Sequence, residues 1–343
     1  MYFATIDCGT TNSRVYLLDD TYQVIGRGQK KVGVRDTVIT GSNEILKEGL
    51  KEVFEDTVKD TGLRMVDIEF AISAGMITSE IGLIDIPHIP GPAGIDELTR
   101  NIKVVRDPTV FPIDIPMIFI CGIKNSLPEN ATYRDIRKTD FMRGEEAQAM
   151  GLIVRYADLK YPVMLIILTS HTKFIYIDEE KRIVGGLSTL SGQIHEAIES
   201  VTSIGKSIKN RSGDTVMDDY FDKGIIGTAY DSVNNAGFLR TILMPRFMDV
   251  LLDTQWYERE LFLNSAITSE DLRTMNDFGL LGFDRHNSVV LVGHKKRSDI
   301  YKYLLKKKLG STQHIKQICE QDEIDRLSID GAIAVAKKTG YLT

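Results

Sequence analysis

The stretch Asp7-Cys8-Gly9-Thr10-Thr11-Asn12-Ser13-Arg14 decides the fold, and it follows directly on the apolar run at residues 2–6. An apolar run with β-branched residues that ends at Asp and Gly predicts a buried strand followed by a tight turn. The next apolar run, at residues 15–18, predicts a second strand. The opening unit is therefore expected to be a β-hairpin rather than a strand followed by a helix.

The turn of this hairpin admits two interpretations. Backbone N–H groups and hydroxyls in such a loop can face phosphate oxygens, while Asp7 holds a hydrated Mg²⁺. An ordinary polar turn, in which Asp, Asn and Ser side chains hydrogen-bond to their own backbone, explains the same residues. The spacing alone does not choose between a phosphate site and a plain turn.

The composition is that of an ordinary globular protein of 343 residues, with 43% hydrophobic and 26% charged residues. A chain of this length is expected to form two domains. The net charge of −6 gives no sign of a nucleic-acid-binding surface. The longest apolar stretches, 115–123 and 162–168, are far shorter than the ~20 residues of a membrane-spanning helix. We therefore expect no nucleic-acid partner and no membrane association.

Cysteine spacing and the first residues both favour the cytoplasm. Cys8, Cys121 and Cys319 have neither disulfide-framework nor metal-ligand spacing. The chain enters its first strand at Tyr2, without a basic leader or an apolar signal segment. A reducing cytoplasmic location is the expectation.

Periodicity predicts strands and helices in the first half of the chain. Apolar residues at 44–61 fall on one face of a helix, with Asn43 as its N-cap and Gly62 as its stop. A second helix is expected at 142–156, with five inward side chains: Met142, Ala149, Met150, Ile153 and Val154. The other expectations are strands at 23–28, 68–74 and 115–121 and a loop at 84–92.

The same order of elements restarts after residue 155. Strands are expected at 163–168, 174–177, 183–186 and 289–292, with a polar turn at 169–173. Helices are expected through most of 193–277 and at 298–309. Two successive units of strand, polar turn, strands and helices indicate a duplicated mixed α/β fold, with lobes at 1–155 and 156–343.

Short motifs follow one another in a recognisable order. The opening turn is joined by Met142-Arg143-Gly144-Glu145-Glu146-Ala147-Gln148. The remaining motifs are Gly33-Val34, Ala74-Gly75-Met76-Ile77-Thr78-Ser79, His171-x-Lys173, Ser191-Gly192-Gln193 and Leu291-Val292-Gly293. This ordered set resembles the 2-dehydro-3-deoxygalactonokinase family of the actin-like ATPase and sugar-kinase superfamily. The resemblance implies a two-lobed actin-like ATPase (ribonuclease H-like duplicated) fold with a nucleotide cleft between the lobes.

Three departures from the family pattern bear on nucleotide binding. Ser170 and Thr172 stand where the family's second phosphate loop has Gly-Thr and a small residue. Residues 279–282 are one residue shorter than the family's Gly-Leu-Leu-Ile-Gly. Gly293-His294-Lys295-Lys296-Arg297 replaces Gly-Thr-Ser-Ser-Leu, a change in the expected nucleotide-base pocket. The three departures together put nucleotide choice and turnover in question.

The resemblance implies that the two polar turns hold the phosphates of ATP and a metal ion. Asp7 would hold Mg²⁺ through water, and Gly293 would let the nucleotide base approach the backbone. A glycine between a strand and a helix, however, needs no ligand. The residues expected to face the phosphates are Gly9, Thr10, Thr11 and Asn12 in the first turn and Ser170, His171 and Lys173 in the second.

The acceptor side is expected at Glu145 and Glu146, at the start of the helix that would connect the lobes. Consecutive side chains on a helix diverge by ~100°, so both carboxylates cannot face one substrate atom. By resemblance one of them, with Glu145 preferred, joins Asp7 in catalysis as the base or metal-orienting group. The other is then a first-turn acid favoured by the helix dipole, and that plain role is also the alternative for both.

The substrate carboxylate is expected to meet arginine, because Arg binds carboxylates bidentately. Arg14, Arg35 and Arg143 are the candidates, and Arg143 is preferred because it lies inside the best motif. Gly75 and Met76 end a strand at the expected cleft. For these two residues, a substrate-facing turn and a strand-ending glycine with a core methionine are equally open.

By resemblance we expect an ATP- and Mg²⁺-dependent sugar-acid kinase that phosphorylates the 6-hydroxyl of 2-dehydro-3-deoxy-D-galactonate in galactonate catabolism. Its partners would then be a small-molecule sugar acid and ATP. One alternative is a phosphohydrolase or ATPase of the same superfamily, with water as acceptor. The other is a non-catalytic sensor of sugar acid or nucleotide, which the altered stretch 293–297 favours. The oligomeric state is left open between monomer and homodimer.

Overall fold

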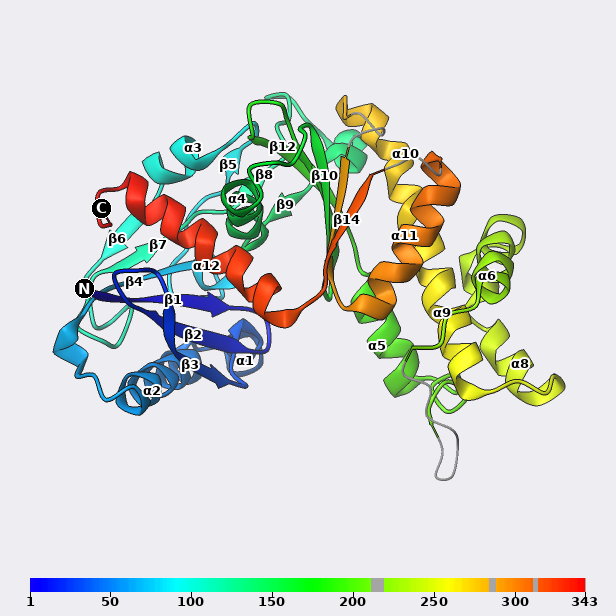
Figure 1. Ribbon diagram of the computed structural model, residues 1–343, viewed down its shortest axis with the longest axis horizontal. Helices are drawn as coiled ribbons and strands as arrows, with labels where there is room; N and C mark the ends of the chain where they lie inside the picture. The colour runs from blue at the N-terminus through cyan, green and yellow to red at the C-terminus, as the bar shows by residue number, and fades with distance from the viewer. Residues whose placement is uncertain (211–218, 284–287, 311–313, 343) are drawn as a thin grey trace.

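Two lobes, each built on one mixed β-sheet, make up the protein (Figure 1). The computed structural model describes residues 1–210, 219–283, 288–310 and 314–342. The strand orders are β3-β2-β1-β4-β7-β6 and β12-β11-β10-β13-β14. In each sheet three antiparallel strands are followed by two that pair in parallel; β6 adds an antiparallel edge to the first sheet alone. The repeated order confirms the duplicated α/β fold that the sequence predicts.

The strands of the first sheet are β1 (Tyr2–Cys8), β2 (Ser13–Leu18), β3 (Val24–Lys30), β4 (Ile68–Gly75), β6 (Lys103–Val105) and β7 (Met117–Phe119). Those of the second are β10 (Val163–Leu168), β11 (Thr172–Ile177), β12 (Ile183–Thr189), β13 (Ser288–Gly293) and β14 (Ile315–Ile318). A small third sheet contains β5 (Ile89–Pro90), β8 (Ile123–Lys124) and β9 (Phe141–Met142).

Helices cover these sheets. The first half of the chain holds α1 (Val34–Thr40), α2 (Glu44–Asp60), α3 (Ile95–Arg100) and α4 (Glu145–Arg155), with 3-10 turns η1 (Met65–Asp67), η2 (Met76–Thr78) and η3 (Tyr133–Lys138). The second half holds α5 (Ser191–Val201), α6 (Lys223–Ala236), α7 (Phe238–Thr241), α8 (Met244–Leu251), α9 (Trp256–Asp271), α10 (Met275–Phe278), α11 (Lys295–Leu309) and α12 (Gln321–Lys338). Two further 3-10 turns are η4 (Leu272–Thr274) and η5 (Gly279–Leu281). No helix within the described ranges is long and apolar enough to cross a membrane.

The central strand β10 shows why its sequence is apolar throughout. Its odd-numbered residues from 163 to 167 pack into the core that contains α4 and α12. Its even-numbered residues from 164 to 168 pack into a second core with α9 and α11. A strand buried on both faces needs apolar side chains at every position, whereas a half-exposed strand alternates.

Helices α4 and α12 cross with their backbones in contact. A Cβ atom on Gly151 would lie 1.8 Å from the Leu327 carbonyl oxygen, and one on Gly331 would lie 1.9 Å from the Ala147 carbonyl oxygen. Only glycine fits at both positions, because any side chain would overlap the partner helix. In Figure 1, α12 runs back from the second sheet across the first lobe, beside α4. The expected lobe boundary near residue 155 stays a prediction.

Several predicted elements are confirmed with small shifts. The helix expected at 44–61 is α2, and Asn43 is its N-cap residue, although its side chain donates to the Gly82 carbonyl rather than to the helix. The strand expected at 115–121 spans only β7, which begins after Pro116 because proline cannot donate a ladder hydrogen bond. Of the long helical region expected at 193–277, residues 211–218 lie outside the described part of the chain.

Other predictions are wrong. The helix expected from Met142 begins at Glu145, since Met142 pairs with Ile123 in the small sheet. Val154 is half exposed rather than turned inward. The stretch 84–92 is not wholly loop, because β5 pairs with β8. The polar turn expected at 169–173 ends earlier, since β11 begins at Thr172 and places Lys173 on a strand.

The crossing of α4 and α12 gives the first testable prediction. Gly151→Ala or Gly331→Ala forces the helix backbones apart, and we expect a loss of about 1–3 kcal/mol of unfolding free energy. Gly227→Ala in α6 is the matched control, because no heavy atom lies within 4 Å of its Cβ position. That control should be neutral or gain ~0.5–1 kcal/mol. Urea unfolding of the three variants is the measurement; equal stability of all three would contradict the packing argument.

Candidate active site

The turn between β1 and β2 is hydrogen-bonded to the start of α1. The Gly9 amide donates to the Asn12 carbonyl at 2.9 Å and closes the turn. The amides of Val34 and Arg35 donate to the carbonyls of Gly9 and Thr10, at 3.2 and 2.9 Å. The carbonyls of Gly9, Thr10 and Asn12 thus each accept a hydrogen bond. Among the described residues, the backbone amides at 10–12 donate to no backbone carbonyl, so they are available to an anion.

Gly33 makes this arrangement of the turn over α1 sterically possible. A Cβ on Gly33 would lie 2.4 Å from the Thr10 carbonyl oxygen, so a larger residue would push the turn away from α1. Thr10 and Thr11 remain exposed, and Asn12 uses its amide only on the Thr11 hydroxyl at 3.0 Å. The side chains of Thr10 and Thr11 are therefore open to solvent rather than packed within the fold.

Asp7 lies at the carboxyl end of β1, recessed but accessible. Its Oδ2 lies 3.4 Å from Nη1 of Arg14, and 42% of its side chain is exposed. Burial raises the pKa of Asp7, Arg14 opposes that rise, and Asp325 of α12 adds to it. A single reachable carboxylate fits Mg²⁺, which commonly takes one or two carboxylates and completes its shell with water and phosphate oxygens. The described residues contain no cluster of three metal-ligating side chains.

The ends of β1 and β4 and the start of α4 meet at two glycines. Gly75 and Gly144 both have positive φ, at 96° and 106°. A Cβ on Gly144 would lie 3.3 Å from the Gly75 Cα, and one on Gly75 would lie 3.2 Å from the Cys8 carbonyl oxygen. Glycine at both positions lets these three chain segments touch. Met76 follows, partly buried against the core.

Arg143 makes several hydrogen bonds within the protein. Its Nη1 donates to the Thr78 carbonyl and hydroxyl at 2.6 and 2.8 Å, and its Nη2 donates to the Ile86 carbonyl at 2.7 Å. Only 6% of the side chain is exposed. The guanidinium therefore holds η2 and the stretch at 85–88 against the start of α4. Its expected role in binding a substrate carboxylate stays a prediction, as do those of Arg14 and Arg35.

Glu145 and Glu146 differ in their surroundings although they are adjacent. Both carboxylate oxygens of Glu146 accept from the Gly144 amide at 2.8 Å, and the side chain is fully buried. Burial, with the nearby Glu145 adding, raises the pKa of Glu146 to about 8. Glu145 is only partly buried, and its Oε2 accepts from the Arg143 amide at 3.2 Å. Burial also raises the pKa of Glu145, but the Lys173 ammonium opposes that rise.

Lys173 connects the second lobe to this carboxylate pair. Its Nζ donates to the Phe141 carbonyl at 2.7 Å and lies 3.6 Å from Oδ1 of Asp140. Asp140 in turn accepts from the Ser188 hydroxyl at 2.8 Å. Residues from β9, β11 and β12 therefore meet beside Glu145. Sequence reasoning did not include Asp140, which comes just before the Met142 motif.

The second turn is held by Arg297, a contact that the sequence did not predict. Its Nη1 donates to the Thr169 carbonyl at 3.0 Å, and its Nη2 donates to the Thr172 hydroxyl at 2.6 Å and to the Ser191 hydroxyl. Asp271 lies 3.5 Å from the same Nη2. A planar guanidinium with several donors can bind all these groups at once.

Glycines bring the remaining segments against this turn. A Cβ on Gly192 would lie 2.4 Å from the Thr169 carbonyl oxygen, and one on Gly293 would lie 2.7 Å from the Leu168 Cβ. Gly293, with φ of 144°, thus lets β13 end against β10. Ser170 is exposed and His171 partly buried, and burial together with Lys173 lowers the pKa of His171.

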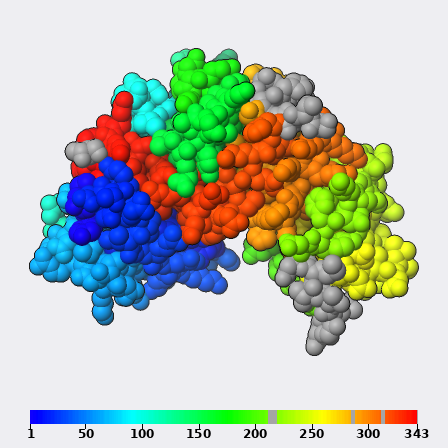
Figure 2. Space-filling view, viewed as in Figure 1, coloured from blue at the N-terminus to red at the C-terminus, as the bar shows by residue number. Residues whose placement is uncertain are grey.

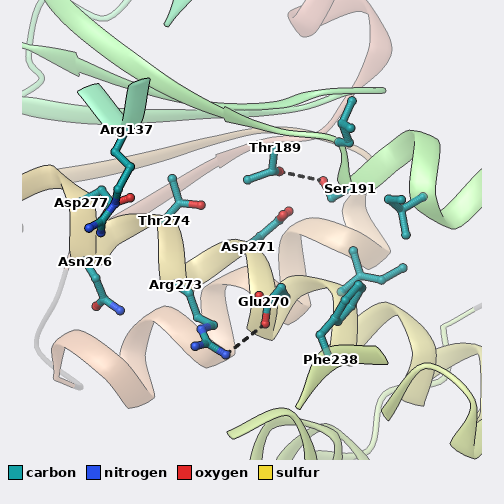
Figure 3. A pocket seen from close by; sticks show the side chains of 13 residues that line it. Arg137, Thr189, Ser191, Phe238, Glu270, Asp271, Arg273, Thr274, Asn276 and Asp277 are labelled. Atoms are coloured by element: carbon teal, nitrogen blue, oxygen red, sulfur yellow. Dashed lines mark hydrogen bonds and ion pairs between the residues drawn. The ribbon is translucent and has the colours of Figure 1, made fainter. Parts of the chain in front are cut away.

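One cavity lies next to the second turn, and another lies at the start of α11. One of about 420 Å³ has Ser191 and Asp271 in its wall and is crossed at one side by Arg137, which pairs with Asp277 (Figure 3). The other, of about 260 Å³, lies at the start of α11. Its lining includes three aromatic residues and two lysines: Tyr220, Phe221, Tyr257, Lys295 and Lys296.

The structure brings the predicted residues together as two groups. Asp7, the first turn, Gly75 and the glutamates form one group in the first lobe, and Lys173 of the second lobe reaches it. Ser170, His171 and Gly293 form the other group, around Arg297. Figure 2 shows the molecule hollowed between the blue part of the first lobe and the green and orange parts of the second.

The duplicated sheets, the two polar turns and the hollow between the lobes define a protein of the actin-like ATPase and sugar-kinase class. The chain belongs to the 2-keto-3-deoxy-galactonokinase family, a family of sugar kinases, whose model matches residues 7–324.

Relatives with assigned names are distant in sequence. "Probable 2-dehydro-3-deoxygalactonokinase DgoK1" of Rhizobium meliloti (strain 1021) is 22% identical over 208 residues, which are 60% of this chain and 59% of that protein. The chain thus spans about 59% of the length of this curated relative in the alignment.

Two solved structures share the fold. A Sinorhizobium meliloti protein assigned as a 2-dehydro-3-deoxygalactonokinase superposes with a TM-score of 0.73 at 17% identity, over 99% of this chain and 98% of that one. A reductive activator for a corrinoid, iron-sulfur protein has a TM-score of 0.52 at 13% identity, over 99% of this chain and 61% of that one. At these identities the likeness concerns the fold alone.

The buried carboxyl of Glu146 gives a prediction on stability. A carboxyl whose pKa is raised in the folded state binds its proton more tightly there than in the unfolded chain, so stability falls as pH rises from about 4.5 to about 8. Glu146→Gln removes this titration. We expect the melting temperature of the variant, relative to that of wild type, to be higher at pH 8.5 than at pH 5. The same difference between variant and wild type at both pH values would contradict the raised pKa.

Proposed function

We propose that this protein transfers the γ-phosphoryl group of ATP to the 6-hydroxyl of 2-dehydro-3-deoxy-D-galactonate. The observation that carries the proposal is the position of Glu145, at the start of α4 where β1 and β4 end, with Lys173 of the other lobe close enough to oppose the rise in its pKa. Membership of the family supplies the substrate class. The names of the Rhizobium and Sinorhizobium proteins support the same sugar acid.

The first turn supports the nucleotide side of the proposal. Amides at 10–12 and the hydroxyls of Thr10 and Thr11 would bind the β- and γ-phosphates. Asp7 would hold Mg²⁺, which when bound neutralises phosphate charge and orients the transferred group. The aromatic cavity at the start of α11 offers a surface for the nucleotide base, with Lys295 and Lys296 at its wall.

The acceptor side needs a group that takes one proton. As the sugar hydroxyl oxygen bonds to the γ-phosphorus, the bond from that phosphorus to the bridging oxygen breaks and ADP leaves. Glu145 would orient the hydroxyl and accept its proton late in the transfer. Glu146 is less suited to that role, because its raised pKa keeps it mostly protonated near neutral pH. Lys173 would neutralise charge on the γ-phosphate or on the sugar acid.

A panel of 2-keto-3-deoxy sugar acids, assayed with Mg-ATP by coupled ADP release, tests the function. We expect 2-dehydro-3-deoxy-D-galactonate to give the highest kcat/KM, with little ADP released when no sugar acid is present. ADP release without any acceptor, abolished in Asp7→Ala, would favour the phosphohydrolase instead. Nucleotide binding with no turnover of any member of the panel would favour the sensor.

The two glutamates provide a matched pair of variants. Glu145→Gln should lower kcat by ~10²-fold or more, because loss of a general base costs 10²–10⁴-fold. Glu146→Gln should retain kcat within about threefold, because an amide resembles the protonated acid that Glu146 already is. Steady-state kinetics on both variants, with their folding checked by circular dichroism, is the measurement. A larger loss in Glu146→Gln would reverse the assignment.

A further inference from the structure

The outer edge of the second lobe carries an apolar surface. It is made by α7, α8 and the two leucines that flank α8, Leu243 and Leu252. Figure 1 places α8 at the end of the molecule away from the junction of the lobes. Six large apolar side chains are exposed there, and we call this set the α8 face: Leu239, Leu243, Phe247, Val250, Leu251 and Leu252. Leu239, at 81%, and Leu251, at 73%, are the most exposed of the six. Phe247, Val250 and Leu251 are spaced as on one face of α8, whereas Leu239 belongs to α7 and Leu243 and Leu252 flank α8.

The two charged residues of α8, Arg246 and Asp249, pair with each other. Asp249, whose side chain is 10% exposed, accepts from the Ser207 hydroxyl at 2.8 Å and from Arg246 Nη1 at 2.9 Å. Arg259 of α9 lies 3.4 Å from the other oxygen of the same carboxylate. The helix therefore turns its carboxylate toward the protein and exposes Phe247, Val250 and Leu251 to water. A surface helix that meets only solvent would expose polar side chains at these positions.

We propose that the α8 face is the interface of a homodimer, covered by the same face of a second copy of this chain. Six such side chains expose on the order of the ~300–600 Å² at which an apolar patch marks an interaction surface. A standard interface buries ~800 Å² per partner, so residues around the edge of the face would supply the remaining area. The same face on two copies can also pair about a two-fold axis.

Charged residues at the two ends of the α8 face fit an antiparallel arrangement of the two α8 helices in the dimer. Arg240 precedes α8 and Asp253 follows it, both exposed and with no ion pair among the described residues. Two antiparallel helices that cross at about 20° bring the start of one near the end of the other. Arg240 of one protomer then lies near the partner's Asp253, twice in the dimer. A lipid-binding helix would instead carry a polar face rich in Lys and Arg, whereas Arg246 is neutralised by Asp249.

Sedimentation velocity over a range of protein concentrations tests the dimer, and it is independent of the kinase assay. Wild type should sediment at twice the 38.5 kDa chain mass. Leu239→Glu should raise the dissociation constant at least about 100-fold, because two carboxylates would be buried without partners. Val66→Glu is the matched control, since Val66 is 80% exposed at η1, outside the α8 face; its mass should equal that of wild type.

A charge swap separates a second copy from any other occupant. Arg240→Asp and Asp253→Arg should each raise the dissociation constant about fivefold, and the double variant should restore it. A wild type that stays monomeric at every concentration overturns the proposal, and so does a dimer that Leu239→Glu leaves intact. Flotation of monomeric wild type with phosphatidylcholine–phosphatidylserine vesicles, lost in Leu239→Glu, also overturns it and assigns the face to lipid.

Discussion

The backbone contact between α4 and α12 is the constraint on which the rest of the structure depends. Gly151 and Gly331 let the two helices approach very closely. A Cβ atom at either position would overlap a backbone carbonyl of the partner helix. The buried side chains of both helices belong to one core that also includes residues from both large sheets. Because α4 begins at Glu145, the position of this crossing also sets where the carboxylate pair lies relative to β1 and β4.

Two adjacent carboxylates acquire different chemistry at the start of α4. Glu146 is enclosed, so burial keeps its proton up to about pH 8, and it serves to fix the Gly144 amide. Glu145 is only partly buried, and the Lys173 ammonium opposes the rise in its pKa. The difference arises from packing, not from residue type, and it gives the neighbouring acids a structural role and a chemical role.

The stretch at 293–297, where the chain departs most from its family pattern, carries a structural substitution. Arg297 binds the Thr169 carbonyl and the hydroxyls of Thr172 and Ser191, so one guanidinium holds the second turn to α5 and α11. The lysines before it line a separate aromatic cavity. The sequence predicts a changed nucleotide-base pocket at this stretch, and the fold shows in addition that its arginine holds the second turn in place.

Sequence by itself determined the duplicated fold, most strands and helices, and the ordered motifs of the family, because apolar periodicity and turn residues are local properties of the chain. It also singled out Asp7 and the glutamate pair as chemistry-bearing residues. Only the tertiary structure decided that Arg143 bonds to Thr78 and Ile86, that Lys173 lies on a strand beside Asp140, and that α12 packs on α4. These contacts join residues far apart in sequence, and their energies depend on burial and distance, which no local pattern encodes.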